Sequence, residues 1–267
     1  MGRGGSVSTS TYLFVPANRL DRVEKAIATG SDEVIVDLED AVGASEKDDA
    51  RRGLAVLQPS RSLCVRINDE STPYFAADLA AVRALSWVSA VVVPKVNSGA
   101  EARRVIEELG PDVATLALVE TARSVRDVDD IAASGVQRLL FGTADYAADL
   151  AASPSPALYA YARARMVVAS AAAGLTAPVD GPTLEIGDDE RLREESELAK
   201  SLGMGGKLCI HPNQVPGVAR VFAAGDRTTE WAIAVLEGFA AHEGNVFVLD
   251  GEMIDAPLVA QARRTLT

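Results

Sequence analysis

Two apolar segments of the sequence each lead to a carboxylate. Residues 116–119 (LALV) run directly into Glu120, and residues 139–141 (LLF) are followed closely by Asp145. An acid at the end of a buried strand loses hydration, so something must compensate its charge. Two carboxylates with open positions between them suit Mg²⁺, which prefers oxygen ligands and completes its shell with water and substrate oxygens. The alternative is that Glu120 and Asp145 are surface acids paired with arginines.

Arg66 places a guanidinium inside another apolar run, residues 63–67 (LCVRI). Its planar fork can hold a carboxylate through two hydrogen bonds, which would orient an α-keto acid against a metal ion. A structural ion pair with Asp37 or Glu39 is the alternative, and the two roles can coexist. Zinc is disfavoured, because the only histidines, His211 and His242, share no ligand spacing.

The elements that would carry these residues follow a βα rhythm. Short apolar or β-branched runs predict strands, and segments of helical periodicity separate them. The predicted strands lie at 12–15, 34–36, 63–67, 91–93, 116–119, 139–141, 178–179 and 208–210. Helices are predicted over 18–29, 100–109, 124–133 and 157–173. This pattern predicts a single (β/α)8 TIM barrel over residues 11–225, with the polar residues that follow the strands gathered at one rim. A doubly wound open sheet is less favoured because no GxGxxG follows the first strand.

The two ends of the chain depart from this rhythm. Residues 1–10 are rich in Gly and Ser and lack the apolar centre of a signal peptide, so they are expected to be disordered. After residue 225 the sequence predicts a helix over 230–241, an extended piece over 245–249 and a last helix over 256–266. We expect residues 226–267 to form a lid over the barrel or to reach a neighbouring subunit.

Composition excludes some classes of partner. The 267 residues include 38 acidic and 26 basic ones, giving a formal charge of −12 and disfavouring nucleic acid and anionic membranes as partners. No apolar stretch is long enough to predict a membrane span. Cys64 and Cys209 lie within apolar runs and outside any CxxC spacing, which indicates buried, reduced thiols in a cytoplasmic protein.

Eight segments together resemble the citrate lyase β-subunit-like family of the HpcH/HpaI aldolase superfamily. In chain order they are YLFVPANR (12–19), VDLEDAV (36–42), VRIN (65–68), PK (94–95), LVET (118–121), FGTAD (141–145), IHPNQ (210–214) and GEMIDAP (251–257). They span nearly the whole chain, and DLEDAV, IHPNQ and GEMIDAP carry most of the specificity. The resemblance implies a Mg²⁺-dependent TIM barrel that cleaves or forms a carbon–carbon bond in a β-hydroxyacyl thioester such as citryl-, malyl- or citramalyl-CoA. It also implies a homotrimer or hexamer.

The same resemblance assigns roles to individual residues. Glu120 and Asp145 would bind the metal, and Arg66 would hold the keto-acid carboxylate. Asp255, in the C-terminal lid and expected from an adjacent subunit, would act in proton transfer. Glu39 and Asp40 are expected to contact water and arginine around the ligands.

A phosphopantetheine thioester, carried by CoA or by an acyl carrier protein, needs local positive charge in this acidic chain. The candidates for its phosphates follow the first strand and the DLEDAV segment: Arg19, Arg22, Lys25, Lys47, Arg51 and Arg52. The alternative is that these side chains form solvated helix faces.

Two other functions remain open. A metal-dependent aldolase acting on CoA-free hydroxy-keto acids is disfavoured because related aldolases use an early histidine base, and no histidine precedes His211. A non-catalytic subunit would not need Arg66, Glu120, Asp145 and Asp255 together, although fold alone does not fix function.

Overall fold

The computed structural model describes residues 9–223 and 229–266. The chain divides into two compact units, a larger one that ends at Phe222 and a smaller one that consists mainly of the residues after it. None of the helices in the described ranges is long and apolar enough to cross a membrane.

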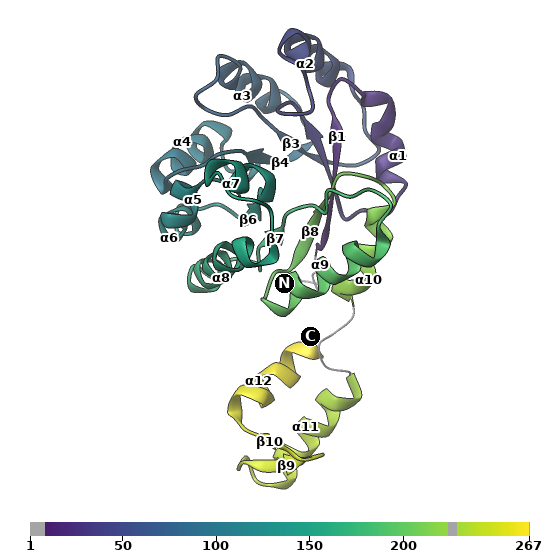
Figure 1. Cartoon of the computed structure of the whole chain (residues 1–267), viewed down its shortest axis with the longest axis vertical. Helices are drawn as coiled ribbons and strands as arrows, with labels where there is room; N and C mark the ends of the chain where they lie inside the picture. The colour runs from purple at the N-terminus through teal and green to yellow at the C-terminus, as the bar shows by residue number, and fades with distance from the viewer. Residues whose placement is uncertain (1–8, 224–228, 267) are drawn as a thin grey trace. The chain divides into compact units, whose positions relative to one another are not determined.

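The larger unit is a closed parallel barrel, which confirms the predicted TIM-barrel class (Figure 1). Its strands follow one another around the barrel in chain order, and β8 pairs with β1 to close it. They are β1 (Thr11–Pro16), β2 (Glu33–Asp37), β3 (Leu63–Arg66), β4 (Val88–Val93), β5 (Ala114–Val119), β6 (Arg138–Phe141), β7 (Val179–Asp180) and β8 (Gly206–Cys209). Each lies at or next to a predicted apolar run.

Helices surround the strands on the outside of the barrel (Figure 1). They are the 3₁₀ turns η1 (Leu20–Arg22) and η2 (Ala44–Glu46), and the helices α1 (Val23–Ile27), α2 (Lys47–Val56), α3 (Phe75–Arg83), α4 (Gly99–Leu109), α5 (Ala122–Arg126), α6 (Val128–Ala132), α7 (Thr143–Asp149), α8 (Pro156–Ala172), α9 (Asp189–Ser201) and α10 (Gln214–Ala223).

Alternation along the strands divides the apolar side chains between two cores. Leu13 and Val15 of β1 point outward and join the large core between strands and helices. Tyr12 and Phe14 of the same strand belong to the smaller core inside the barrel, together with residues such as Leu118 and Leu208. The interior is therefore filled with apolar side chains up to the level of Phe14.

Two predicted helices differ in detail from the observed ones. The segment predicted over 124–133 is broken at Asp127, whose φ of −100° and ψ of 17° end α5 and begin α6. Asp127 also pairs through both carboxylate oxygens with Arg126, and Asp competes with the helix for local hydrogen bonds. The helix predicted over 18–29 begins as the 3₁₀ turn η1 before α1.

The predicted disordered segment over residues 1–10 lies mostly outside the described residues. Its last two residues are held by hydrogen bonds. The Ser10 amide donates to Asp32 over 2.8 Å, and the Thr9 carbonyl accepts from Arg138 over 2.6 Å. These two residues are therefore attached to the barrel.

The smaller unit contains a helical hairpin and a two-stranded sheet. Helix α11 (Thr229–Ala241) is followed by β9 (Phe247–Leu249), β10 (Glu252–Ile254) and α12 (Ala256–Thr265). The strands pair antiparallel through a turn in which Asp250 and Gly251 have φ of 50° and 86°. Phe247 and Ile254 pack with Ala232, Val235 and Val259 in a separate core. The two helices and β9 were predicted, whereas β10 was not.

Candidate active site

The predicted site residues of the barrel lie at the carboxyl ends of its strands. Asp37 ends β2 and Arg66 ends β3, while Glu120 directly follows β5 and Asp145 lies in the first turn of α7 after β6. All four line one pocket. Parallel strands present their carboxyl ends at one edge, so residues far apart in sequence meet there.

Arg66 is held rigidly at the base of this pocket. Its Nε and Nη2 donate to the two oxygens of Asp37 over 2.7 and 2.6 Å, and Nη1 lies 2.9 Å from Oε2 of Glu39. The guanidinium also lies 4.8 Å from the centre of the Phe14 ring. Burial lowers the pKa of Arg66, but the charge of Asp37 outweighs this effect and raises it. The structural ion pair considered for Arg66 is thus present, and two N–H groups of the guanidinium remain for a ligand.

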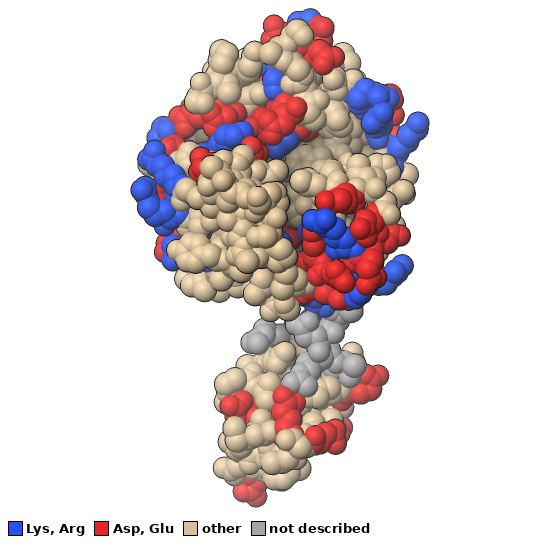
Figure 2. Space-filling view, in the orientation of Figure 1, with Lys and Arg blue, Asp and Glu red and all other residues tan. Residues whose placement is uncertain are grey.

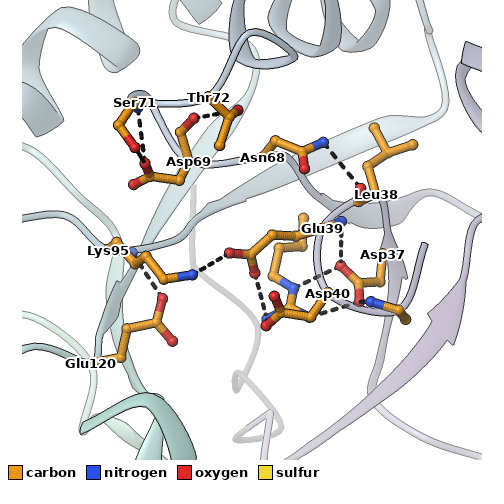
Figure 3. Close-up of polar contacts among 12 residues, drawn as sticks. Asp37, Leu38, Glu39, Asp40, Asn68, Asp69, Ser71, Thr72, Lys95 and Glu120 are labelled. Atoms are coloured by element: carbon orange, nitrogen blue, oxygen red, sulfur yellow. Dashed lines mark hydrogen bonds and ion pairs between the residues drawn. The ribbon is translucent and has the colours of Figure 1, made fainter. Parts of the chain in front are cut away.

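Glu39 and Glu120 are connected through Lys95, as Figure 3 shows. The Lys95 ammonium donates to Glu39 Oε1 over 2.6 Å, and the Lys95 backbone N–H donates to Glu120 Oε1 over 2.8 Å. Lys95 has a φ of 51°, in the left-handed region that few non-glycine residues adopt. This conformation lets one residue contact both acids, and the strained backbone lies directly at the site.

The other oxygen of Glu120 lies against Gly142. A Cβ atom at residue 142 would overlap Oε2 and Cβ of Glu120. Gly142 connects β6 to α7, which carries Asp145. The absence of a side chain at this one residue therefore gives the buried Glu120 carboxylate its space beside the Asp145 segment.

The site carries more negative charge than its own cations neutralise. Five carboxylates, of Asp37, Glu39, Asp40, Glu120 and Asp145, lie around two cations, Arg66 and Lys95. Burial, reinforced by Glu39 and Asp145, raises the pKa of Glu120 well above its ordinary value of 4.5, and Arg66 and Lys95 only partly offset this. Burial likewise raises the pKa of Glu39. A divalent cation would offset this excess of negative charge.

The available ligands suit a metal ion that binds oxygen atoms and is only partly surrounded by protein groups. No group of three or more His, Cys, Asp or Glu side chains able to hold a metal exists among the residues described. Glu120 and Asp145 would provide two carboxylate ligands and leave the other positions to water and substrate, which is the usual arrangement for Mg²⁺. Asp40 is exposed and 3.8 Å from Arg66, so it lies at the margin of the site.

The predicted phosphate-binding cations fall into two groups. Arg19, Arg22 and Lys25 are exposed on and before α1, where Figure 2 shows basic side chains at the surface. Arg19 is paired with Asp21 through two hydrogen bonds of 3.0 Å.

Lys47 belongs to the second group and has a different environment. Its ammonium is buried and donates to the carbonyls of Leu38 and Glu39 and to Oδ1 of Asn68, over 2.6 to 2.7 Å. Three acceptors use all three of its N–H groups, which leaves none for a phosphate. Lys47 instead fixes the loop that carries Glu39. Arg51 is likewise paired, with Asp48 and Asp78, and Arg52 with Asp49.

Asp255 lies in the smaller unit, outside the barrel. Its side chain accepts a hydrogen bond from the backbone of Leu258 over 3.3 Å and caps the N-terminus of α12. An N-cap carboxylate is a common structural feature.

The sequence did not reveal this capping role of Asp255, nor the contacts that Lys95 and Gly142 make with Glu120. The short PK and FGT segments were the only signals for those two residues.

Comparison with known proteins identifies the family of the chain. Residues 10–212 match the HpcH/HpaI aldolase/citrate lyase family. The chain belongs to this family. A citrate lyase subunit beta-like protein of Deinococcus radiodurans is 34% identical over 96% of both chains. A (3S)-malyl-CoA thioesterase of Cereibacter sphaeroides is also 34% identical, over 96% of this chain and 93% of its own.

Solved structures of the HpcH/HpaI aldolase/citrate lyase family show which ligands one relative binds. CitE from Mycobacterium tuberculosis, in complex with magnesium, acetoacetate and coenzyme A, is 33% identical, with a TM-score of 0.85 and 97% of both chains covered. A second structure of M. tuberculosis CitE contains magnesium and pyruvate (30% identity, TM-score 0.77, 98% and 99% covered). A citrate lyase beta subunit from M. tuberculosis is complexed with oxaloacetate and magnesium (34%, 0.72, 82% and 98%). The family is therefore enzymatic, and its members include lyase-like and thioesterase proteins.

Proposed function

We propose that this protein is a Mg²⁺-dependent carbon–carbon lyase that cleaves or forms a β-hydroxyacyl-CoA thioester, yielding a keto acid and an acyl-CoA. The observation that carries the proposal is the pocket in which Glu120, Asp145 and Arg66 meet and in which carboxylates outnumber cations. The magnesium and coenzyme A bound by the M. tuberculosis relative support it.

Each residue has a defined part in this proposal. Glu120 and Asp145 would hold the ion, and the two remaining N–H groups of Arg66 would bind the keto-acid carboxylate. Bound there, Mg²⁺ would supply positive charge that lowers the pKa of the substrate hydroxyl and stabilises the resulting alkoxide, whose oxygen becomes the keto group of the product. Arg66 adds a fixed charge, because Asp37 prevents it from reorienting.

Cleavage breaks the bond between the hydroxyl-bearing carbon and the α-carbon of the thioester. The electron pair of that bond passes to the thioester enolate, the hydroxyl loses its proton, and the α-carbon gains one. We propose that Asp255 of an adjacent subunit delivers that proton in a homotrimer or hexamer, and that Arg19, Arg22 and Lys25 contribute to CoA binding. The buried, unpaired thiols of Cys64 and Cys209 support a cytoplasmic location.

The direct test is a panel of citryl-, malyl- and citramalyl-CoA assayed with Mg²⁺ and with EDTA. The proposal predicts keto acid and acyl-CoA in equal amounts, with at least about a hundredfold loss of rate in EDTA. Turnover of CoA-free hydroxy-keto acids alone, or turnover unaffected by EDTA, would contradict it.

Thioester hydrolysis is the second candidate, because the thioesterase relatives are as similar as the lyase-like ones. A thioesterase acting on malyl-CoA releases free CoA and malate and leaves the carbon skeleton intact. Free thiol without keto acid in the same panel would favour hydrolysis over cleavage.

The role of Asp255 has its own test. Asp255→Asn and Glu120→Gln proteins would each be inactive alone, but mixed oligomers would contain sites with both residues intact. Recovery of activity after joint refolding supports a shared site. Absence of recovery in verified hetero-oligomers contradicts it, and Asp255→Ser, which can still cap α12, separates capping from catalysis.

A further inference from the structure

The pocket that contains Glu120, Asp145 and Arg66 has one cation for a carboxylate ligand. Arg66 is the only Lys or Arg among the described residues that line it. Three of the five N–H groups of Arg66 already face Asp37 and Glu39, so two remain. Two parallel N–H groups satisfy one carboxylate.

The other cationic side chains near this pocket bind carboxylates outside it. Lys95 lines the adjacent depressions on the Asp69 side, and its ammonium is bound to Glu39. Lys207 and Arg163 line a depression on the opposite side that shares Thr143 and Pro182 with the pocket. Arg163 donates two of its N–H groups and Lys207 one to the buried carboxylate of Asp180, at 2.8 to 3.0 Å, and neither side chain lines the pocket itself.

The rest of the pocket repels a second negative charge. Its floor is formed by Phe14, Leu118 and Leu208, the uppermost side chains of the apolar barrel interior. Asp40 and Asp145 add negative charge at its edge. A second carboxylate bound here would lose hydration against apolar side chains and would gain no second cation from the lining residues.

We propose that the keto acid handled at this site is a monocarboxylic 2-oxo acid with a hydrogen or a short alkyl group, and not a dicarboxylic one such as oxaloacetate. This inference rests on the proposed lyase function. It selects glyoxylate, pyruvate and 2-oxobutyrate as reaction partners, and therefore selects malyl- or citramalyl-type thioesters over citryl-CoA. The relatives do not decide the matter, because the M. tuberculosis structures contain pyruvate in one case and oxaloacetate in the other.

The test is a binding comparison of 2-oxobutyrate with freshly dissolved oxaloacetate, by calorimetry with Mg²⁺ and with EDTA. These acids have the same number of carbons and differ in a terminal methyl group or carboxylate. We expect 2-oxobutyrate to bind at least about tenfold more tightly, and only with Mg²⁺ present. Oxaloacetate binding as tightly as 2-oxobutyrate would overturn the inference.

A variant at the mouth of the pocket tests whether the lack of a second cation causes the preference for a monocarboxylic acid. Ile210 lines the pocket, is 36% exposed, and is held through its backbone by Gln214. Ile210→Lys adds a cation for a distal carboxylate and should shift the affinity ratio toward oxaloacetate by about fivefold or more. Ile210→Met is the matched control and should leave the ratio unchanged. An unchanged ratio in Ile210→Lys counts against the inference.

Assays of citryl-CoA and citramalyl-CoA separate this inference from the function on which it rests. Mg²⁺-dependent cleavage of citryl-CoA together with tight oxaloacetate binding would overturn the inference and leave the lyase function standing. Absence of both Mg²⁺-dependent 2-oxo acid binding and thioester cleavage would overturn both.

Discussion

Two clusters of buried charge lie at the carboxyl ends of the barrel strands, and they differ in balance. In the first, Asp180 receives Arg163 and Lys207, and Glu195 pairs with Arg191 and lies 3.9 Å from Lys207, so each acid has at least one cation of its own. In the second, the acids outnumber the cations, because Asp37, Glu39, Asp40, Glu120 and Asp145 surround Arg66 and Lys95. A balanced cluster needs nothing further, whereas an acidic one is stable only with protons or a bound cation.

The pKa values reflect this difference. Burial pushes the pKa of Asp180 upward, but Lys207 and Arg163 outweigh it and hold the pKa below 3.8. At Glu120 burial acts together with neighbouring acids, and the pKa lies well above 4.5. We therefore expect the first cluster to stabilise the fold and the second to bind and react.

Removing the charge of Glu120 should have the largest effect on activity. Glu120→Gln keeps the shape of the side chain but removes a metal ligand, and we expect kcat/KM to fall by about 10³-fold or more. Without Mg²⁺ the variant should be at least as stable as the parent protein, because a buried, uncompensated carboxylate has been removed. The measurements are thioester cleavage with Mg²⁺ and thermal unfolding in EDTA. Normal activity in Glu120→Gln would show that the unbalanced cluster is not the reactive one.

Removing Asp180 should instead lower stability and leave the Mg²⁺ dependence of activity unchanged. Asp180→Ala leaves Arg163 and Lys207 buried without their shared partner, and the free energy of unfolding should fall by about 3–5 kcal/mol. The Mg²⁺ concentration for half-maximal activity should not change in the protein that remains folded. Glu197→Ala, which breaks an exposed pair with Arg193, serves as the control and should leave urea unfolding unchanged. A change in Mg²⁺ dependence would mean that the two clusters act as one.

Most of the barrel could be predicted from sequence because each buried strand is a short apolar run. That Glu120, Asp145 and Arg66 meet in one pocket could be predicted for a related reason, because a charged residue in or just after such a run is exceptional. Lys47 could not be placed correctly, because its position after DLEDAV does not reveal that Leu38, Glu39 and Asn68 surround its ammonium. The strain at Lys95 and the close approach at Gly142 are tertiary features without a sequence periodicity.

Gly142 offers a smaller perturbation of the acidic cluster. In Gly142→Ala the added methyl group would overlap the Glu120 carboxylate, and we expect Mg²⁺ affinity to fall about 10- to 100-fold, as when groups that orient metal ligands are altered. Gly43→Ala is a suitable control, since its backbone is compatible with alanine and its new Cβ would meet only Glu46 at 3.4 Å. Calorimetric titration with Mg²⁺ measures the Mg²⁺ affinity of both variants. Equal affinity in the two variants would mean that Glu120 is free to move.

The smallest expected effect is a difference in the pH dependence of stability without metal. Glu120 has a raised pKa when folded, so it contributes stability below 4.5 that is lost as pH rises toward its folded value. Asp180 has a lowered pKa, so its contribution is present above 3.8 and is lost as pH falls through its folded value. In EDTA, the free energy of unfolding of Glu120→Gln should therefore fall less steeply with pH above about pH 4.5 than that of the parent protein. Part of the fall should remain, because burial also raises the pKa of Glu39. Asp180→Asn should instead flatten the loss of stability below about pH 4. Urea unfolding across this range measures both, and the same change of slope in the two variants would contradict the assignment of opposite charge balance to the two clusters.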